Sequence, residues 1–129
     1  MALTTTLERI IAAKPCKECY VTLLGHFRQK FPFDREFSIA TVLESNELLD
    51  ALWCLRAIKK GASVIIAIAQ ELVDSMTEYQ HADTNMLAGS KRNAKDTRYI
   101  ADYALNVCAP EDIATEQRKQ EAILRKYCA

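Results

Sequence analysis

The residues best suited to chemistry are two cysteines in the segment Cys16-Lys17-Glu18-Cys19. Pro15 precedes them and suits the first turn of a helix, where its missing N–H would be unpaired anyway. A thiol in such a turn has a lowered pKa because the helix N-terminus is partly positive, and the resulting thiolate can exchange with disulfides. The redox motif normally rests on a strand–helix unit, and the sequence predicts no strand before it.

The same two cysteines could instead bind zinc, which needs two further ligands in a tetrahedral site. His26 lies on the same helical face as Cys19, but the intervening helix separates them by about 10.5 Å. Two ligands of one zinc ion are only about 4 Å apart. Cys54 or Cys108 could complete a site only through tertiary contact. We therefore expect free thiols at Cys16 and Cys19 and no cofactor, with a zinc site and a redox pair as alternatives.

No other set of residues has a catalytic spacing. The two histidines, His26 and His81, have no nucleophile tied to them by spacing. Phosphate-binding glycine loops and the GxSxG and HExxH motifs are absent from the sequence. The sequence therefore predicts a protein that is not an enzyme.

A basic cluster is the second candidate site, and on a helix its members would lie on or beside one face. Tyr99 could add stacking, whereas Asp96 and Asp102 interrupt the positive charge. The chain as a whole has 17 basic and 17 acidic side chains, so its net charge offers phosphate no attraction. We expect a solvated face, with nucleic-acid or acidic-partner binding as the alternative. The members are Lys91, Arg92, Lys95, Arg98 and Tyr99.

The elements that must position these residues are helices, because apolar side chains recur every three to four positions through most of the chain. We expect a single all-α domain over residues 1–129, a compact bundle of about six or seven helices. A polar loop is expected near residues 81–90, and the last helix has a weak apolar face that includes two glutamines. The clearest amphipathic face consists of Ile65, Ile68, Ala69, Leu72, Met76 and Tyr79.

The sequence also indicates the compartment of the protein and its contacts with membranes and with a second copy. Residues 1–8 lack the basic and apolar regions of a secretory signal. The longest apolar run, residues 64–69, would rise only about 9 Å as a helix, far short of a bilayer. An odd number of cysteines favours free thiols in a reducing cytoplasm. We expect no membrane contact, and a homodimer could cover Leu72, Met76, Tyr79 and the last helix.

One segment resembles known proteins. The sequences SIATVLESN at residues 38–46 and LDALWCLRA at residues 49–57 follow the pattern SIAxxLxSN…DALWCLRA. This pattern resembles a segment of small helical proteins from tailed phages and of related immunity-type proteins, with looser similarity at residues 67–73 and 118–125. The resemblance implies a helical fold and a bacterial or phage origin, and it transfers no catalytic or ligand residues.

Together these patterns predict a non-enzymatic accessory protein of a phage or prophage, acting in the cytoplasm of the bacterial host. Its expected partner is a host or phage protein, and host modulation or anti-defence is one form of that role. A nucleic-acid-associated factor that uses the helix around residues 91–98 is the alternative. A small zinc protein centred on Cys16 and Cys19 is the second alternative.

Overall fold

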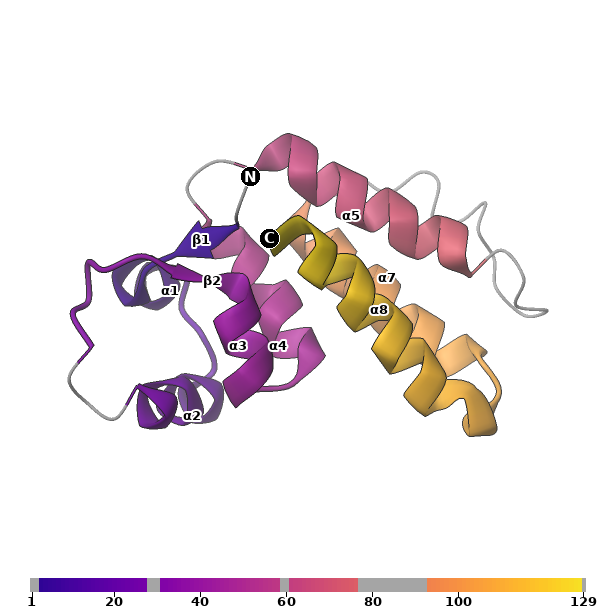
Figure 1. The fold of residues 1–129 in the computed structure, drawn as a ribbon, viewed down its shortest axis with the longest axis horizontal. Coiled ribbons are helices and arrows are strands. Elements are labelled where there is room, and N and C mark those ends of the chain that lie inside the picture. Colours follow the sequence, from indigo (N-terminus) through magenta and orange to yellow (C-terminus); the bar gives the residue numbers. More distant parts are fainter. Residues whose placement is uncertain (1–2, 28–30, 59–60, 77–92, 129) are drawn as a thin grey trace.

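The computed structural model describes residues 3–27, 31–58, 61–76 and 93–128, and within these ranges it contains seven α-helices (Figure 1). The predicted all-α bundle is therefore confirmed. The helices are α1 (Leu7–Ala12), α2 (Lys17–His26), α3 (Ile39–Ser45), α4 (Leu48–Trp53), α5 (Ala62–Ser75), α7 (Ala94–Val107) and α8 (Ile113–Cys128). Short 3₁₀ helices, η1 (Cys54–Ala57) and η2 (Pro110–Asp112), follow α4 and precede α8.

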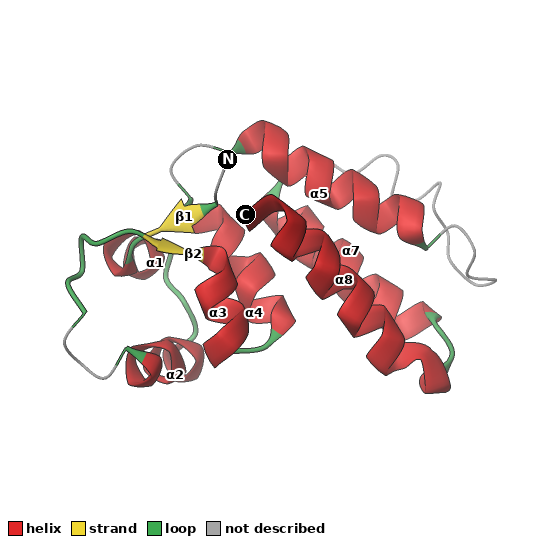
Figure 2. Cartoon of the chain, viewed as in Figure 1, coloured by secondary structure: helices red, strands yellow, loops and turns green. Residues whose placement is uncertain are grey.

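Two very short strands join the N-terminus to the middle of the chain. Strand β1 (Thr4–Thr5) pairs antiparallel with β2 (Phe37–Ser38), beside α1 and the start of α3 (Figure 2). The buried Thr5 hydroxyl also donates to the Ala57 carbonyl at 2.7 Å. Strands of two residues cannot show an alternating pattern, which explains why the sequence predicts none here.

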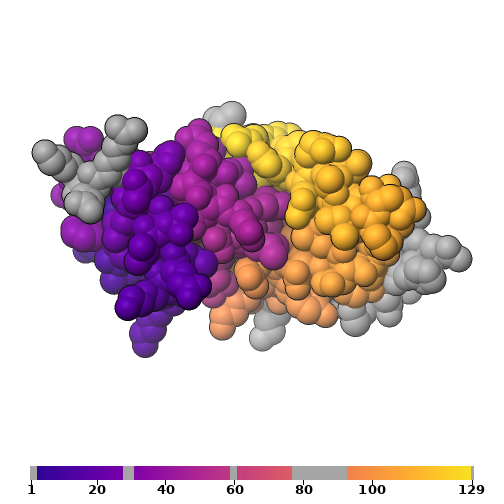
Figure 3. All heavy atoms as spheres, turned by 90° about the horizontal axis from the view of Figure 1, so that it is seen from below, coloured from indigo at the N-terminus to yellow at the C-terminus, as the bar shows by residue number. Residues whose placement is uncertain are grey.

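The helices form a continuous body with α2 at one end and the C-terminal helices at the other. The space-filling view shows this order, with α3 and α4 between the two ends (Figure 3). Helix α7 packs against both α4 and α5, and α5 also contacts α8. The core runs through all of these contacts. Its largest fully buried apolar side chains are Leu7, Ile10, Ile39, Leu52, Leu55, Ile68, Leu72, Met76, Ile100 and Leu124.

Helix α5 buries the predicted amphipathic face inside the monomer. Ile65, Ile68, Ala69, Leu72 and Met76 are all buried. The prediction that Leu72 and Met76 offer a surface for a second copy is therefore wrong, because α7 and α8 already cover that side of α5. The third residue of that surface, Tyr79, lies outside the described residues.

Helix α8 follows its predicted inner face, Ile113, Gln117, Gln120, Leu124 and Tyr127, only in part. Ile113 and Gln117 are exposed, whereas Glu116 and Gln120 are buried with Leu124. Gln120 Nε2 donates to the Ala101 carbonyl at 3.0 Å and to Glu116, whereas Gln120 Oε1 is buried without a hydrogen-bond partner among the described residues. Satisfied hydrogen bonds allow polar side chains to occupy the inner face.

The part of the chain between α5 and α7 was predicted to contain the polar loop at residues 81–90. That segment, together with Lys91 and Arg92, lies outside the described residues. Among the described helices, none is both long and apolar enough to cross a bilayer.

Candidate functional site

A pocket of about 380 Å³ lies between α1, α2, the α3–α4 corner and α7. Cavities of this size are typical of small-ligand sites, which usually have apolar walls and a few polar groups. We call it the α2–α7 pocket. The residues that bring functional groups to its wall are Cys16, Cys19, Tyr20, Asp50, Cys54 and Arg98.

The two cysteines of the CxxC segment occupy the first turn of α2. The helix begins at Lys17, two residues later than the predicted start at Pro15, so Cys16 is the N-cap residue, and its exposed Sγ accepts the Cys19 N–H at 3.5 Å. This hydrogen bond lowers the pKa of the Cys16 thiol, because it stabilises the thiolate. Interaction with Cys16, followed by burial, raises the pKa of Cys19 to about 12. The pKa values of these two neighbouring thiols are therefore shifted in opposite directions.

Asp50 and Asn46 hold α2 against the α3–α4 corner. The Cys19 thiol donates to Asp50 Oδ1 at 3.5 Å. Asn46 Nδ2 donates to the Cys19 carbonyl at 3.0 Å and to Asp50 Oδ2 at 3.2 Å. Ser45 Oγ orients this amide by donating to Asn46 Oδ1 at 2.7 Å. The Cys19 thiol and the Asp50 carboxylate are therefore held in contact by a shared network.

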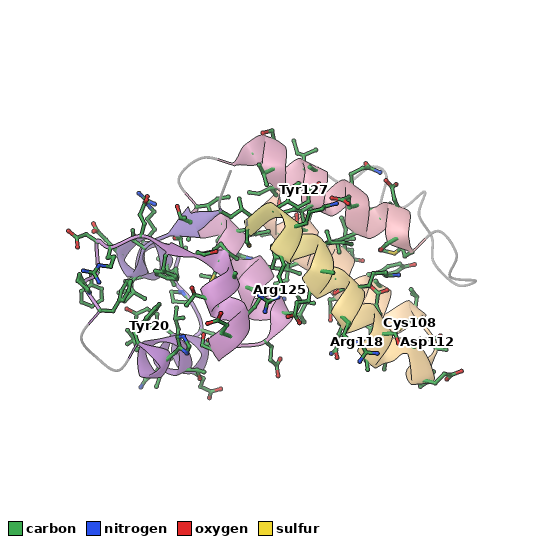
Figure 4. All side chains as sticks on the ribbon, viewed as in Figure 1. Tyr20, Cys108, Asp112, Arg118, Arg125 and Tyr127 are labelled. Carbon is green, nitrogen blue, oxygen red and sulfur yellow. The ribbon has the colours of Figure 1, made fainter. Side chains whose placement is uncertain are left out.

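Two polar atoms in the pocket wall are buried without partners among the described residues. They are the Tyr20 hydroxyl and Arg98 Nε. Figure 4 shows Tyr20 between α2 and α1. Burial raises the pKa of Tyr20, so its hydroxyl stays protonated and can donate. A buried donor without a partner costs about 1–3 kcal/mol, which an incoming acceptor would recover.

A second guanidinium, that of Arg56, contacts the pocket residue Trp53 but does not itself line the pocket. The Arg56 guanidinium lies 4.5 Å from the centre of the Trp53 ring, and its Nε donates to the Trp53 carbonyl at 2.9 Å. Burial lowers the pKa of Arg56, and the neighbouring charge of Arg98 lowers it further. A cation whose charged form is disfavoured in this way favours an anion beside it.

The third thiol of the pocket, Cys54, is suited to packing. It is buried, and that burial raises its pKa to about 12. It therefore remains a protonated thiol at neutral pH.

The described residues bring no further metal ligands to Cys16 and Cys19. Within the described ranges, no three His, Cys, Asp or Glu side chains are grouped so that they could hold an ion. His26, which the sequence places on the same helix as Cys16 and Cys19, lies 3.9 Å from Glu44 Oε2 and does not line the pocket.

The described part of the basic cluster does not form one surface. Lys95 and Tyr99 are exposed, and Tyr99 packs against Tyr103 with ring centres 6.4 Å apart. Arg98 is half-buried and turns toward the α2–α7 pocket instead. Asp96 closes a capping box with Asn93 at the start of α7. Arg98, which the sequence predicts to lie on a solvated face, therefore lines the pocket.

Sequence reasoning finds the cysteine pair but not its companions. Tyr20, Asp50 and Arg98 come from three helices, and no local spacing links them. Trp53 is half-buried, packs against the hydrophobic core and also lines the pocket.

We compared the chain with protein-family models, curated proteins and solved structures, and none of the three comparisons gives a match.

Proposed function

We propose that this protein acts by binding a protein partner, without chemical transformation of it, and that the α2–α7 pocket receives a side chain of that partner. The observation that carries the proposal is the pair of buried donors without partners, Tyr20 Oη and Arg98 Nε, in the wall of the pocket. An acidic group of the partner would accept from both, and an adjoining apolar part would fill the remaining space. Central, desolvated pockets of this kind hold the anchor residues of many interfaces.

The resemblance of residues 38–57 to helical phage proteins supports a narrower version of the proposal. In it, the protein is an accessory protein of a phage or prophage whose partner is a host or phage protein, and host modulation or anti-defence is its role. Five free cysteines favour the reducing cytoplasm of a bacterial host as its location.

The test compares pocket variants with surface variants of the same type. Tyr20→Phe and Arg98→Met remove the two donors, and Tyr99→Phe and Lys95→Met are the exposed controls on α7. The tagged protein and its variants are used to capture partners from host lysate, which mass spectrometry identifies. The affinity for a purified partner is then measured by calorimetry.

We expect Tyr20→Phe to weaken binding about 3- to 10-fold, from one neutral hydrogen bond of about 0.5–1.5 kcal/mol. Arg98→Met should weaken it about 10- to 100-fold, because the lost bond joins charged groups. The stability of each variant is measured as a control, so that a loss of binding is not a loss of folding. Tyr20→Phe removes a buried hydroxyl without a partner and should not lower the stability. Equal affinity of pocket and control variants would contradict the proposal, and so would retention of nucleic acid in place of a protein.

A further inference from the structure

The first turn of α2 brings two thiols within bonding reach. Cys16 is the N-cap residue and Cys19 the third residue of a ten-residue helix. Helix geometry places Cα atoms three residues apart at about 5 Å, inside the range of about 4.4–6.8 Å that a disulfide accepts. The two residues are already in contact, since the Cys19 N–H donates to Cys16 Sγ at 3.5 Å. The pair can therefore be bridged without moving the backbone far.

The two thiols differ in access. Cys16 is exposed at the mouth of the pocket, whereas Cys19 is half-buried and donates to Asp50 Oδ1. A thiolate at a helix N-terminus is stabilised by the free N–H groups of the first turn, and here the Cys19 N–H fills that role. An exposed nucleophile with a protected second thiol behind it is the arrangement that thiol–disulfide exchange requires.

We propose that Cys16 and Cys19 form a thiol–disulfide exchange site, in which Cys16 attacks an exposed disulfide, Cys19 resolves the product and Asp50 accepts the Cys19 proton. The substrate class is an accessible disulfide of a small molecule or protein. This exchange reaction is a second activity, separate from the proposed binding of a partner, and it uses neither Tyr20 nor Arg98, so either can fail without the other.

The electrons and protons balance in two steps. The Cys16 thiolate attacks one sulfur of the substrate disulfide, so that a mixed disulfide forms and the first substrate thiolate leaves. Cys19 then loses its proton toward Asp50 and attacks Cys16 Sγ, which releases the second substrate thiolate. The protein dithiol is oxidised by two electrons to a disulfide, and the substrate is reduced to two thiols. Once Cys16 is in the mixed disulfide, its negative charge no longer holds the Cys19 proton.

The remaining cysteines serve as internal controls. Cys54, Cys108 and Cys128 are buried, and burial raises the pKa of each of them. Thiols of this kind are inert toward exchange, because little thiolate is present and access is blocked. Reaction is therefore expected to be confined to the first turn of α2.

The test exposes the full-length protein to glutathione buffers of increasing oxidised fraction, followed by acid quenching, alkylation of free thiols and mass spectrometry. Trypsin cleaves after Lys17, so a bridge between Cys16 and Cys19 would join two otherwise separate peptides. We expect wild-type protein to lose two hydrogen atoms and yield these linked peptides. Cys19→Ser should retain glutathione on Cys16, Cys16→Ser should form neither product, and Cys54→Ser should behave as wild type.

Asp50→Asn provides a readout that a purely structural role would not move. It retains an oxygen for the Asn46 amide but cannot accept a proton, so the mixed disulfide should persist longer and its resolution should become more dependent on pH. The proposal would be overturned if all five thiols stay reduced in fully oxidised glutathione, or if Cys16 pairs with Cys54. Alkylation of Cys16 no faster than in the urea-unfolded chain would also overturn it.

Discussion

Replacing Lys119 by methionine should destabilise the protein through the carboxylate that Lys119 neutralises. The Glu116 side chain is 0% exposed, and Lys119 Nζ lies 2.8 Å from Glu116 Oε1. Lys119 Nζ also donates to the Ser75 carbonyl at 3.1 Å, which ties α8 to the end of α5. Methionine has a similar apolar stem without the charge, so the packing is largely kept while both contacts are lost.

The magnitude follows from the burial of the pair. Removal of one partner from a buried ion pair costs about 3–5 kcal/mol. Water screens part of this interaction, because the Lys119 side chain is 36% exposed, and Gln120 still donates to Glu116. We therefore expect a loss of about 2–3 kcal/mol. At about 2.1 cal/mol/K per residue, 129 residues unfold with an entropy of about 270 cal/mol/K, so Tm falls by about 7–11 °C.

Thermal unfolding followed by far-ultraviolet circular dichroism measures this change. Lys95→Met makes the same substitution at an exposed position of α7 and should leave Tm nearly unchanged. The double variant Lys119→Met with Glu116→Gln should regain part of the loss, since a neutral amide costs less to bury than a carboxylate. The reasoning is refuted if Lys119→Met lowers Tm no more than Lys95→Met does, or if the double variant regains nothing.

Substitutions at three further positions test other parts of the molecule. Lys14 has a left-handed φ of 60°, which costs a residue with a Cβ about 1–2 kcal/mol, so urea unfolding should show Lys14→Gly to be more stable by about 1 kcal/mol and Lys14→Ala unchanged. Thr5→Val removes the buried hydrogen bond to the Ala57 carbonyl and should cost about 1–3 kcal/mol in the same assay; wild-type stability would contradict this. Hydrogen bonding from Lys126 lowers the pKa of Glu71 below its ordinary 4.5. That stabilisation is present above the ordinary value and is lost as pH falls through the lower folded-state pKa, so Glu71→Gln should flatten the acid side of stability against pH, and an unchanged acid side would count against the ion pair.

Local pattern predicts the helices of this protein well. The apolar side chains of α5 recur at helical spacing, and Ile65, Ile68 and Leu72 are buried as expected. The position of the cysteine pair at the start of a helix is also predicted, because Pro15 and the following polar residues favour a helix start close to Cys16. These features depend on neighbours within one or two turns, and the chain specifies such neighbours directly.

Packing between distant segments determines the features that the pattern predicts poorly. Helix α8 buries Glu116, which its apolar pattern does not place inward, because Lys119 and Gln120 both bond to its carboxylate there. Two strands of two residues pair across more than thirty positions of the chain, too short to alternate visibly.

The α2–α7 pocket follows the same rule. Helical periodicity tells which side chains turn away from water, a property of each segment alone. Periodicity does not tell which inward faces contact each other. The sequence therefore predicts Arg98 to be one of several surface cations, whereas the packing of α7 against α4 places it in the pocket wall. The sequence by itself therefore determines the helices and the position of the two cysteines. The pocket is determined only by the tertiary structure, because its walls come from three helices and the α3–α4 corner, which share no local spacing.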